Sequence, residues 1–183
     1  MALDRTTVSR PPRAPSSDRR GSVLTLLGCL VIAAAIATLE GVVSMGGASD
    51  WFWRSAQVIW TPAPWLARIV WALVFLLLAV AGWRIWRLPR AGAGSWLRGL
   101  HVVALGLVTV WPPVYLDGYP LLGPTALWLG FATAFLLVAV LAVLIGATWR
   151  AVRVAAVLLI PAAVWIGYVT TVNFGDAVLA SLG

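Results

Sequence analysis

The stretch WLARIVWALVFLLLAVAGWRIW (Trp65–Trp86) decides the fold, because it stays apolar long enough to cross a bilayer. About 20 apolar residues in a helix cross the ~30 Å of hydrocarbon, and in lipid the backbone must pair with itself, which requires a helix. Four more stretches share this character: Ser22–Ser44, Trp96–Leu116, Leu121–Ala147 and Val154–Gly175. We therefore predict an all-α membrane protein, a bundle of five transmembrane helices at about 22–44, 65–86, 96–116, 121–147 and 154–175.

The composition agrees with a membrane protein. The chain has 183 residues, of which 62% are hydrophobic and 10% are charged, whereas soluble domains carry about 25% charged residues. We therefore expect a multi-pass protein of the cell membrane whose surroundings are the lipid bilayer. The formal net charge is +7, and the basic residues are all arginines at the ends of apolar stretches. Arginines so placed encode membrane topology, so we expect no nucleic-acid partner.

The charged residues predict the orientation of the bundle, because cytoplasmic connections carry the excess of basic residues. One side holds a basic N-terminal tail, residues 1–21, which we predict to be disordered, and Arg84, Arg87, Arg90, Arg98, Arg150 and Arg153. The other side holds Asp50, Arg54, Arg68, Asp117 and Asp176. We therefore predict a cytoplasmic N-terminus, a five-helix domain over residues 22–175, and a short C-terminal tail, residues 176–183, on the outside.

Aromatic side chains gather in the outer half of the predicted bundle. A rise of about 1.5 Å per helical residue gives their depth, and the connection before the second helix, loop 1, adds tryptophans at the outer surface. Tryptophan and tyrosine gather at the interfaces of any membrane protein, so an interfacial belt and a ligand site both stay open. The candidate site residues are Trp51, Trp60, Trp65, Trp111, Trp128, Trp165, Tyr168, Val169 and Asn173.

Prolines near these residues favour a site. A proline lacks the amide donor and crowds the carbonyl four residues before it, so it ends or kinks a helix. TPAP (Thr61–Pro64) stiffens loop 1, WPP (Trp111–Pro113) is expected to end the third helix, and Pro161 is expected to kink the fifth. A rigid loop over a kinked bundle leaves room for a cavity.

Residues for ordinary catalysis and metal binding are scarce. The sequence has no Ser-His-Asp set, P-loop, GxGxxG motif or paired carboxylates. The one cysteine, Cys29, lies in an apolar stretch, and the one histidine, His101, lies near the inner end of the third helix, where we expect a surface or a packing residue. One histidine and one cysteine cannot form a structural zinc site. We therefore expect no enzyme activity, no catalytic residue, no metal and no obligatory cofactor.

Small residues recur every four positions in two of the predicted helices. The series are Ala126-Gly130-Ala134 and Ala33-Ala37-Gly41. Such spacing lets two helices approach closely. Each series fits either a contact within the bundle or a dimer face.

Two segments carry a resemblance to a known family. The pattern W-x8-W-x-P-x2-W-x5-W, formed by Trp51, Trp60, Pro62, Trp65 and Trp71, resembles the first loop and second helix of the TspO/MBR family. The segment LLIPAAVWIGYVTTVNF, residues 158–174, is similar to the fifth helix of that family. The family includes the tryptophan-rich sensory proteins of bacteria and the mitochondrial translocator protein. The likeness covers about residues 24–174.

The resemblance implies a function. Family members form homodimers of five-helix bundles and bind porphyrins (tetrapyrroles) and similar hydrophobic ligands, as sensors or in transport. By position, the implied cavity under loop 1 is lined by Trp51, Trp60, Trp111, Trp165, Val169 and Asn173. A porphyrin or haem-like ligand would stack on indole rings, and Arg54 or Arg68 could hold its carboxylates. Two alternatives stay open: light-dependent porphyrin degradation, and an assembly subunit that binds no ligand.

Several positions depart from the family pattern. Val58 stands where the family usually has a proline, and Val108 stands where it has an asparagine. The basic residue of the animal cholesterol motif is absent, because no arginine follows Arg153. The resemblance therefore implies a divergent bacterial member whose ligand preference is its own.

Overall fold

The computed structural model describes residues 57–89 and 92–182, together with residues 21, 23–24, 26–31, 34–35 and 38. Among these residues every regular element is a helix. Four helices are long and apolar enough to cross a membrane: α3 (Pro64–Trp86), α4 (Ala93–Pro112), α6 (Pro124–Ala151) and α7 (Arg153–Leu182). A short π-helix, η1 (Pro113–Asp117), and a single turn, α5 (Tyr119–Leu122), connect α4 to α6. The prediction of an all-helical membrane protein is confirmed for this part of the chain.

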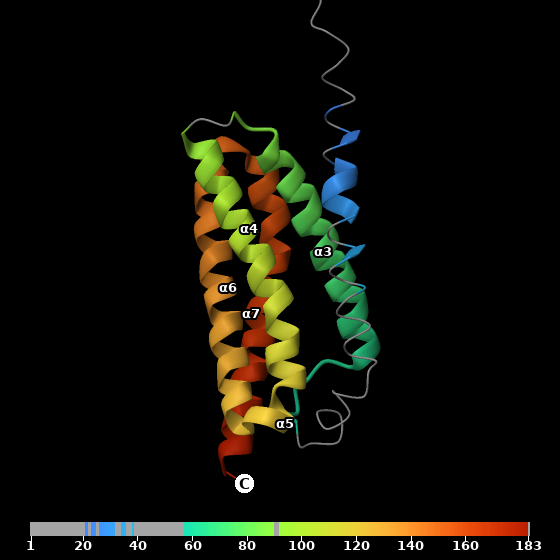
Figure 1. The fold of residues 1–183 in the computed structure, drawn as a ribbon, viewed down its shortest axis with the longest axis vertical. Coiled ribbons are helices and arrows are strands. Elements are labelled where there is room, and N and C mark those ends of the chain that lie inside the picture. Colours follow the sequence, from blue (N-terminus) through green and yellow to red (C-terminus); the bar gives the residue numbers. More distant parts are fainter. Residues whose placement is uncertain are drawn as a thin grey trace, which may run out of the picture.

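The first predicted span, residues 22–44, is described only in part. Residues 26–31 are helical, and Cys29 and Leu30 pack against the main core. The blue segment beside α3 in Figure 1 belongs to this span. Trp51, Arg54, the basic tail and the series Ala33-Ala37-Gly41 lie outside the described residues. The predictions made for them, and the count of five spans, stay predictions.

The long helices pack side by side into a bundle (Figure 1). Helix α7 packs against α3 and α6, and α4 packs against α6 and α3. The connections α3–α4 and α6–α7 lie at one end, which we call the arginine end. Its cations are Arg84, Arg87, Arg98, Arg150 and Arg153. The opposite end, the loop end, holds residues 57–63, α5 and the last turns of α7 (Figure 1).

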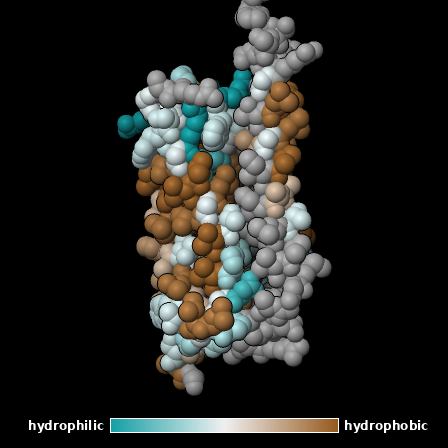
Figure 2. Space-filling view, in the orientation of Figure 1, coloured by the Kyte–Doolittle hydropathy of each residue, from teal (hydrophilic) through white to brown (hydrophobic). Residues whose placement is uncertain are grey.

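The surface shows the same division along the bundle axis. Figure 2 shows hydrophilic residues gathered at the arginine end and a broad hydrophobic band below them. Arginines at this end lie over tryptophan rings: Arg98 is 5.6 Å from the ring centroid of Trp86, and Arg153 is 5.7 Å from that of Trp149. Cations within about 6 Å of an indole centroid are attracted to its face. Tryptophans in such places, near the ends of membrane-spanning helices, are typical of an interfacial belt.

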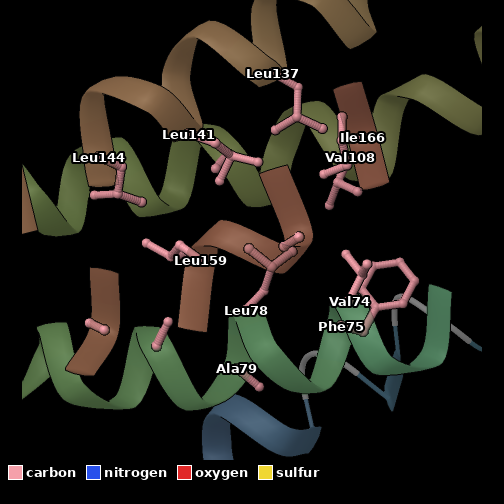
Figure 3. Packing of buried hydrophobic residues seen from close by; sticks show 14 of the residues in the cluster. Val74, Phe75, Leu78, Ala79, Val108, Leu137, Leu141, Leu144, Leu159 and Ile166 are labelled. Carbon is pink, nitrogen blue, oxygen red and sulfur yellow. The ribbon is translucent and has the colours of Figure 1, made fainter. Parts of the chain in front are cut away.

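Aliphatic side chains from all four long helices form the main core (Figure 3). On α6 the core residues Leu137, Leu141 and Leu144 are spaced four and three residues apart, so they lie on one helix face. They meet Leu78 of α3 and Leu159 of α7, and all five side chains are buried. Because lipid is as apolar as leucine, close packing rather than exclusion of water holds such helices together.

The small residues of α6 contact the same bundle. Ala126, Gly130 and Ala134 are buried. A Cβ atom added to Gly130 would lie 2.7 Å from Cδ2 of Tyr115 in η1, so the glycine is what lets this ring approach α6. The series Ala126-Gly130-Ala134 therefore makes a contact within the bundle, as one of the two alternatives left open by the sequence predicts.

His101 packs inside the bundle. Its side chain is buried, and a Cβ atom added to Gly82 would lie 2.3 Å from its Nε2 atom. The missing side chain at Gly82 of α3 therefore provides the space that the imidazole of α4 fills. Of the two roles left open by the sequence, a surface residue or a packing residue, the structure shows the packing residue.

The Trp-Pro-Pro sequence does not end the third helix, and that prediction is wrong. Helix α4 includes Pro112 and continues as the π-helix from Pro113 to Asp117. The two prolines have φ angles of −61° and −62°, which are normal for a helix. Their missing N–H groups interrupt the regular pairing, and a π turn shifts that pairing by one residue. The chain thereby stays helical and keeps Tyr115 on the bundle side.

The last helix is longer than predicted, so residues 176–182 are not a separate tail. Helix α7 runs from Arg153 to Leu182 and passes through Pro161 and Gly175. The sequence prediction ended the helix at Gly175, where an acid follows the apolar stretch. That acid, Asp176, is buried and hydrogen-bonded, so it does not need water and the helix continues.

Candidate ligand site

Three aromatic rings at the loop end of the bundle form a stack. The Trp71 ring of α3 lies 5.4 Å from the Trp111 ring of α4, with an angle of 27° between their planes. The Trp111 ring lies 5.3 Å from the Tyr115 ring of η1, at 16°. Trp111 and Tyr115 are four residues apart on a helical segment, so they share a face. We call these three rings the aromatic stack.

Asn173 fixes the central ring of the stack. It is fully buried on α7. In the amide orientation that satisfies both of its groups, Oδ1 accepts from Nε1 of Trp111 at 2.6 Å and Nδ2 donates to the carbonyl of Val169 at 3.2 Å. A buried indole N–H needs such an acceptor. The asparagine therefore holds the Trp111 ring between its two neighbours.

Trp165 lies beside the stack, and its indole N–H has no partner among the residues that the structure describes. It packs against the buried cluster that contains Trp111, Tyr115 and Val169, and its ring lies 5.5 Å from that of Tyr168. Its Nε1 atom is buried, and no acceptor for it lies within the described residues. A buried donor without a partner is costly. An acceptor on a bound molecule would satisfy it.

The other predicted site residues lie elsewhere. Trp60 and Trp65 are 47% and 65% exposed, and Arg68, in the first turns of α3, is exposed. Trp128 belongs to a second group of rings on α6 and α7. Its ring is edge-on to those of Phe131 and Phe174, and its Nε1 atom donates to Oγ of Ser181 at 3.2 Å. Depth along the helix was estimated from the sequence, but depth does not say which face a residue occupies.

Two residues of this region were not predicted as site residues. Tyr115 belongs to the aromatic stack, and its hydroxyl donates to Oδ2 of Asp176 at 2.5 Å. Oδ1 of Asp176 accepts from the backbone N–H of Val58 at 3.0 Å, and the acid is only 4% exposed. A sequence signal existed: Tyr115 follows Trp111 by four residues, and Asp176 follows Asn173 by three. Continuing both helices past their expected ends places each pair on one face.

The end of loop 1, residues 57–63, rests on α7. Val58 starts a turn that closes with a hydrogen bond from Thr61 N to Val58 O at 3.0 Å. A Cβ atom added to Gly175 would lie 2.5 Å from Cγ1 of Val58 and 3.1 Å from Cζ2 of Trp60. The hydroxyl of Tyr168 donates to the carbonyl of Trp60. The loop is therefore attached to α7 by packing and by hydrogen bonds.

The described residues offer aromatic faces and hydrogen-bonding groups rather than a metal centre. Among them no group of three His, Cys, Asp or Glu side chains could hold a metal ion. The polar groups at the loop end include the indole N–H of Trp165, the amide of Asn173, the hydroxyls of Tyr115 and Tyr168, and the buried carboxylate of Asp176.

Together, helices of membrane-spanning length and an aromatic, amide-bearing cluster at one end define a multi-pass helical membrane protein. The chain matches the model of the TspO/MBR family over residues 28–178. It therefore belongs to the TspO/MBR family, and this membership indicates a membrane sensor or transporter-like role. Comparison with curated proteins gave no match.

Proposed function

We propose that the protein binds a porphyrin, or a similarly flat hydrophobic molecule, at the loop end of the bundle, and that it acts as a sensor or transporter for it. The observation that carries the proposal is the state of Trp165. Its indole packs on the cluster that contains the aromatic stack, while its buried N–H has no acceptor within the described residues. A ligand that brings both a π face and an acceptor fits these two features.

The chemistry of a porphyrin suits the surrounding residues. Its ring system is flat and apolar, so it gains most from offset stacking on indole and phenol rings. Its carboxylate tails need cations near the membrane surface, where Arg68 is exposed. A guanidinium binds a carboxylate through two parallel hydrogen bonds. In this arrangement the tails face the surface and the ring faces the bundle.

We propose binding rather than catalysis as the role of this site. Acid–base catalysis needs an acid and a base that both reach the reacting group. The one buried carboxylate at the loop end, within the described part of the chain, already accepts from a tyrosine and an amide. That the protein is a homodimer stays a prediction from the family resemblance.

The test is a titration of protoporphyrin IX into the purified protein, followed by its visible absorption and by tryptophan fluorescence. Trp165→Ala and Trp51→Ala are expected to weaken binding, because each removes a stacking face. Trp165→Phe separates the two contributions of that residue, since it keeps a ring and removes the N–H. Trp96→Ala is the matched control, because Trp96 is an exposed tryptophan at the arginine end.

The two alanine variants are expected to bind protoporphyrin IX about tenfold more weakly than the unmodified protein, or weaker still. The reason is that stacking on one aromatic side chain contributes ~1–3 kcal/mol. Trp96→Ala is expected to bind as the unmodified protein does. Equal affinity in Trp165→Ala, Trp51→Ala and Trp96→Ala would refute a site at the loop end.

A further inference from the structure

We propose that the last turn of α3 binds the phosphate group of an acidic phospholipid through Arg84 and Arg87, which both lie over the ring of Trp83. This site is at the arginine end, at the opposite end of the bundle from the aromatic stack. The proposal therefore does not depend on the porphyrin proposed above. The occupant is a lipid of the surrounding leaflet, which is the cytoplasmic leaflet in the predicted orientation.

The first step is the geometry of the two guanidinium groups, which share one indole ring. Their central carbons lie 4.7 Å and 5.3 Å from the ring centroid of Trp83. The indole face attracts both cations, whereas like charges three residues apart on a helix repel each other. An anion that contacts Arg84 and Arg87 together removes this repulsion and leaves both contacts with the ring in place. The arrangement thus suits an anion with several acceptor oxygens.

The second step is the lack of a counter-ion. The described part of the chain holds two acids, Asp117 and Asp176, and both lie at the loop end. Within that part, the contact with Trp83 is the one interaction that the guanidinium groups of Arg84 and Arg87 make. A group of cations without acids among the surrounding residues attracts anions. The anion at this end has to come from outside the described residues.

Arg98, at the same end, is used differently. Its guanidinium group donates to two backbone carbonyls at the end of α3. Those hydrogen bonds connect α4 to α3 and occupy donors that an anion would need. Arg98 is therefore a structural residue and not part of the proposed site.

The third step is a comparison within the chain. The pattern W-R-x-x-R of residues 83–87 recurs at residues 149–153, at the same end of the bundle. In the α3 copy the backbone stays helical at Arg87, with φ −80° and ψ −11°. In the other copy the helix is interrupted at Val152, with φ −148° and ψ 78°. Of the two arginines there, only Arg153 lies over Trp149. Two guanidinium groups on one ring thus distinguish the α3 copy from a like sequence.

The fourth step concerns the source of the phosphate. Spacings of three and four residues, or their sums, put Leu73, Leu76, Arg84 and Arg87 on one face of α3. The two leucines are 50% and 48% exposed. Leu73 lies roughly 16 Å from Arg84 along the helix axis, so the apolar strip is long enough for an acyl chain. A free phosphate gains nothing from exposed leucines, whereas a phospholipid contacts both the cations and the strip.

The fifth step separates this site from the general encoding of topology. Topology requires positive charge, which lysine supplies as well as arginine. Binding of phosphate through two parallel hydrogen bonds requires the guanidinium fork, because the ammonium group of lysine is a point charge. An exchange of Arg84 and Arg87 for lysine therefore keeps the topology signal and removes the fork.

The test is native mass spectrometry of the full-length protein titrated with dioleoyl phosphatidylglycerol or dioleoyl phosphatidylcholine. The two lipids have the same acyl chains, and only phosphatidylglycerol carries a net negative charge. The dissociation constant of the first bound lipid is compared. The unmodified protein is expected to bind phosphatidylglycerol at least about tenfold more tightly, since each arginine near an acidic lipid contributes a factor of about five.

Two double variants act on the site. Arg84→Gln with Arg87→Gln removes both charges, and Arg84→Lys with Arg87→Lys keeps them. Both variants are expected to bind phosphatidylglycerol about tenfold more weakly than the unmodified protein. The lysine variant keeps the test valid if the glutamine variant folds poorly. Arg150→Gln with Arg153→Gln is the matched control: it removes two charges at the same end, from exposed side chains that do not share a ring. It is expected to bind as the unmodified protein does.

Each alternative has its own result. Equal affinity for the two lipids in the unmodified protein overturns the proposal. Binding by the lysine variant as tight as that of the unmodified protein shows attraction by charge alone and overturns the phosphate site. Equal losses in the two glutamine variants show a general positive field and overturn the role of Trp83. Displacement of the lipid by inorganic phosphate overturns the lipid as the source of the anion.

Discussion

Gly130 of α6 offers a quantitative test of how the bundle is packed. In Gly130→Ala the new methyl group would lie 2.7 Å from Cδ2 and 2.9 Å from Cβ of Tyr115. Carbon atoms in contact prefer about 3.5–4.0 Å, so the Tyr115 ring or α6 must move by roughly 0.8 Å. One of these two atoms is Cβ, which is bonded to the backbone of η1, so rotation of the ring alone does not relieve the clash.

The expected cost follows from two opposing terms. Overpacking a tight contact costs ~1–3 kcal/mol, whereas replacing glycine by alanine within a helix contributes about 1 kcal/mol of stabilisation. A net destabilisation of about 1–2 kcal/mol is expected. A displaced Tyr115 also draws its hydroxyl away from Asp176, so the loop end loses part of its hydrogen bonding.

The assay is reversible unfolding in mixed detergent micelles, which gives the free energy of unfolding. Gly146→Ala is the matched control, since Gly146 lies on the same helix with no atom within 4 Å of the added Cβ. It is expected to stabilise the protein by about 1 kcal/mol, the intrinsic helix preference. Equal stabilities of Gly130→Ala and Gly146→Ala would refute the contact between α6 and η1. If Gly130→Ala instead changed the oligomeric state and left the stability of the monomer unchanged, the result would favour a dimer face at Gly130.

Three further substitutions test other contacts by the same unfolding assay. Asn173→Leu is expected to lose ~1–3 kcal/mol, because it leaves the N–H of Trp111 buried without an acceptor; a stability equal to that of the parent protein would contradict the bond. Gly82→Ala is expected to lose ~1–3 kcal/mol through a clash with His101, and a double mutant with His101→Ala should recover most of the loss. Arg98→Ala is expected to lose about 1–2 kcal/mol, because Arg98 donates to two carbonyls at the end of α3. Arg87→Ala is its control, because Arg87 is exposed.

The membrane-spanning helices could be predicted from sequence because lipid removes the alternatives. An apolar stretch of sufficient length has only the helix available to it, so α3, α6 and most of α4 and α7 were expected within a few residues of where they lie. The helix ends were harder. Pro112 and Gly175 signal a break in most proteins, yet here a π turn and a buried acid carry both helices onward.

The site could be predicted only in part, because side-chain partners come from distant segments. Trp111 and Asn173 were expected near one another from depth and family resemblance, and the structure joins them by a hydrogen bond. The sequence predicts that Asp176 is a charge outside the membrane, since an acid near the end of a span usually meets water. Its partners, Tyr115 and Val58, lie 61 and 118 residues away along the chain. No local sequence pattern predicts a hydrogen bond between residues so far apart along the chain.

The two ends of the bundle differ in the surroundings of their buried polar groups, and the difference bears on the proposed function. At the arginine end, cations lie over tryptophan rings near the surface, as expected of an anchor. At the loop end, polar groups are buried: the Asn173 amide, the Asp176 carboxylate and the Trp165 indole N–H. Burying them is costly unless each is paired, and an aliphatic end would hold helices together without that cost. Among the described residues the arginine end also buries unpaired polar atoms, on Arg84, Arg98 and His101. Only the loop end places such an atom, the indole N–H of Trp165, against the cluster that contains the aromatic stack. That combination supports the loop end as the place where the proposed ligand binds.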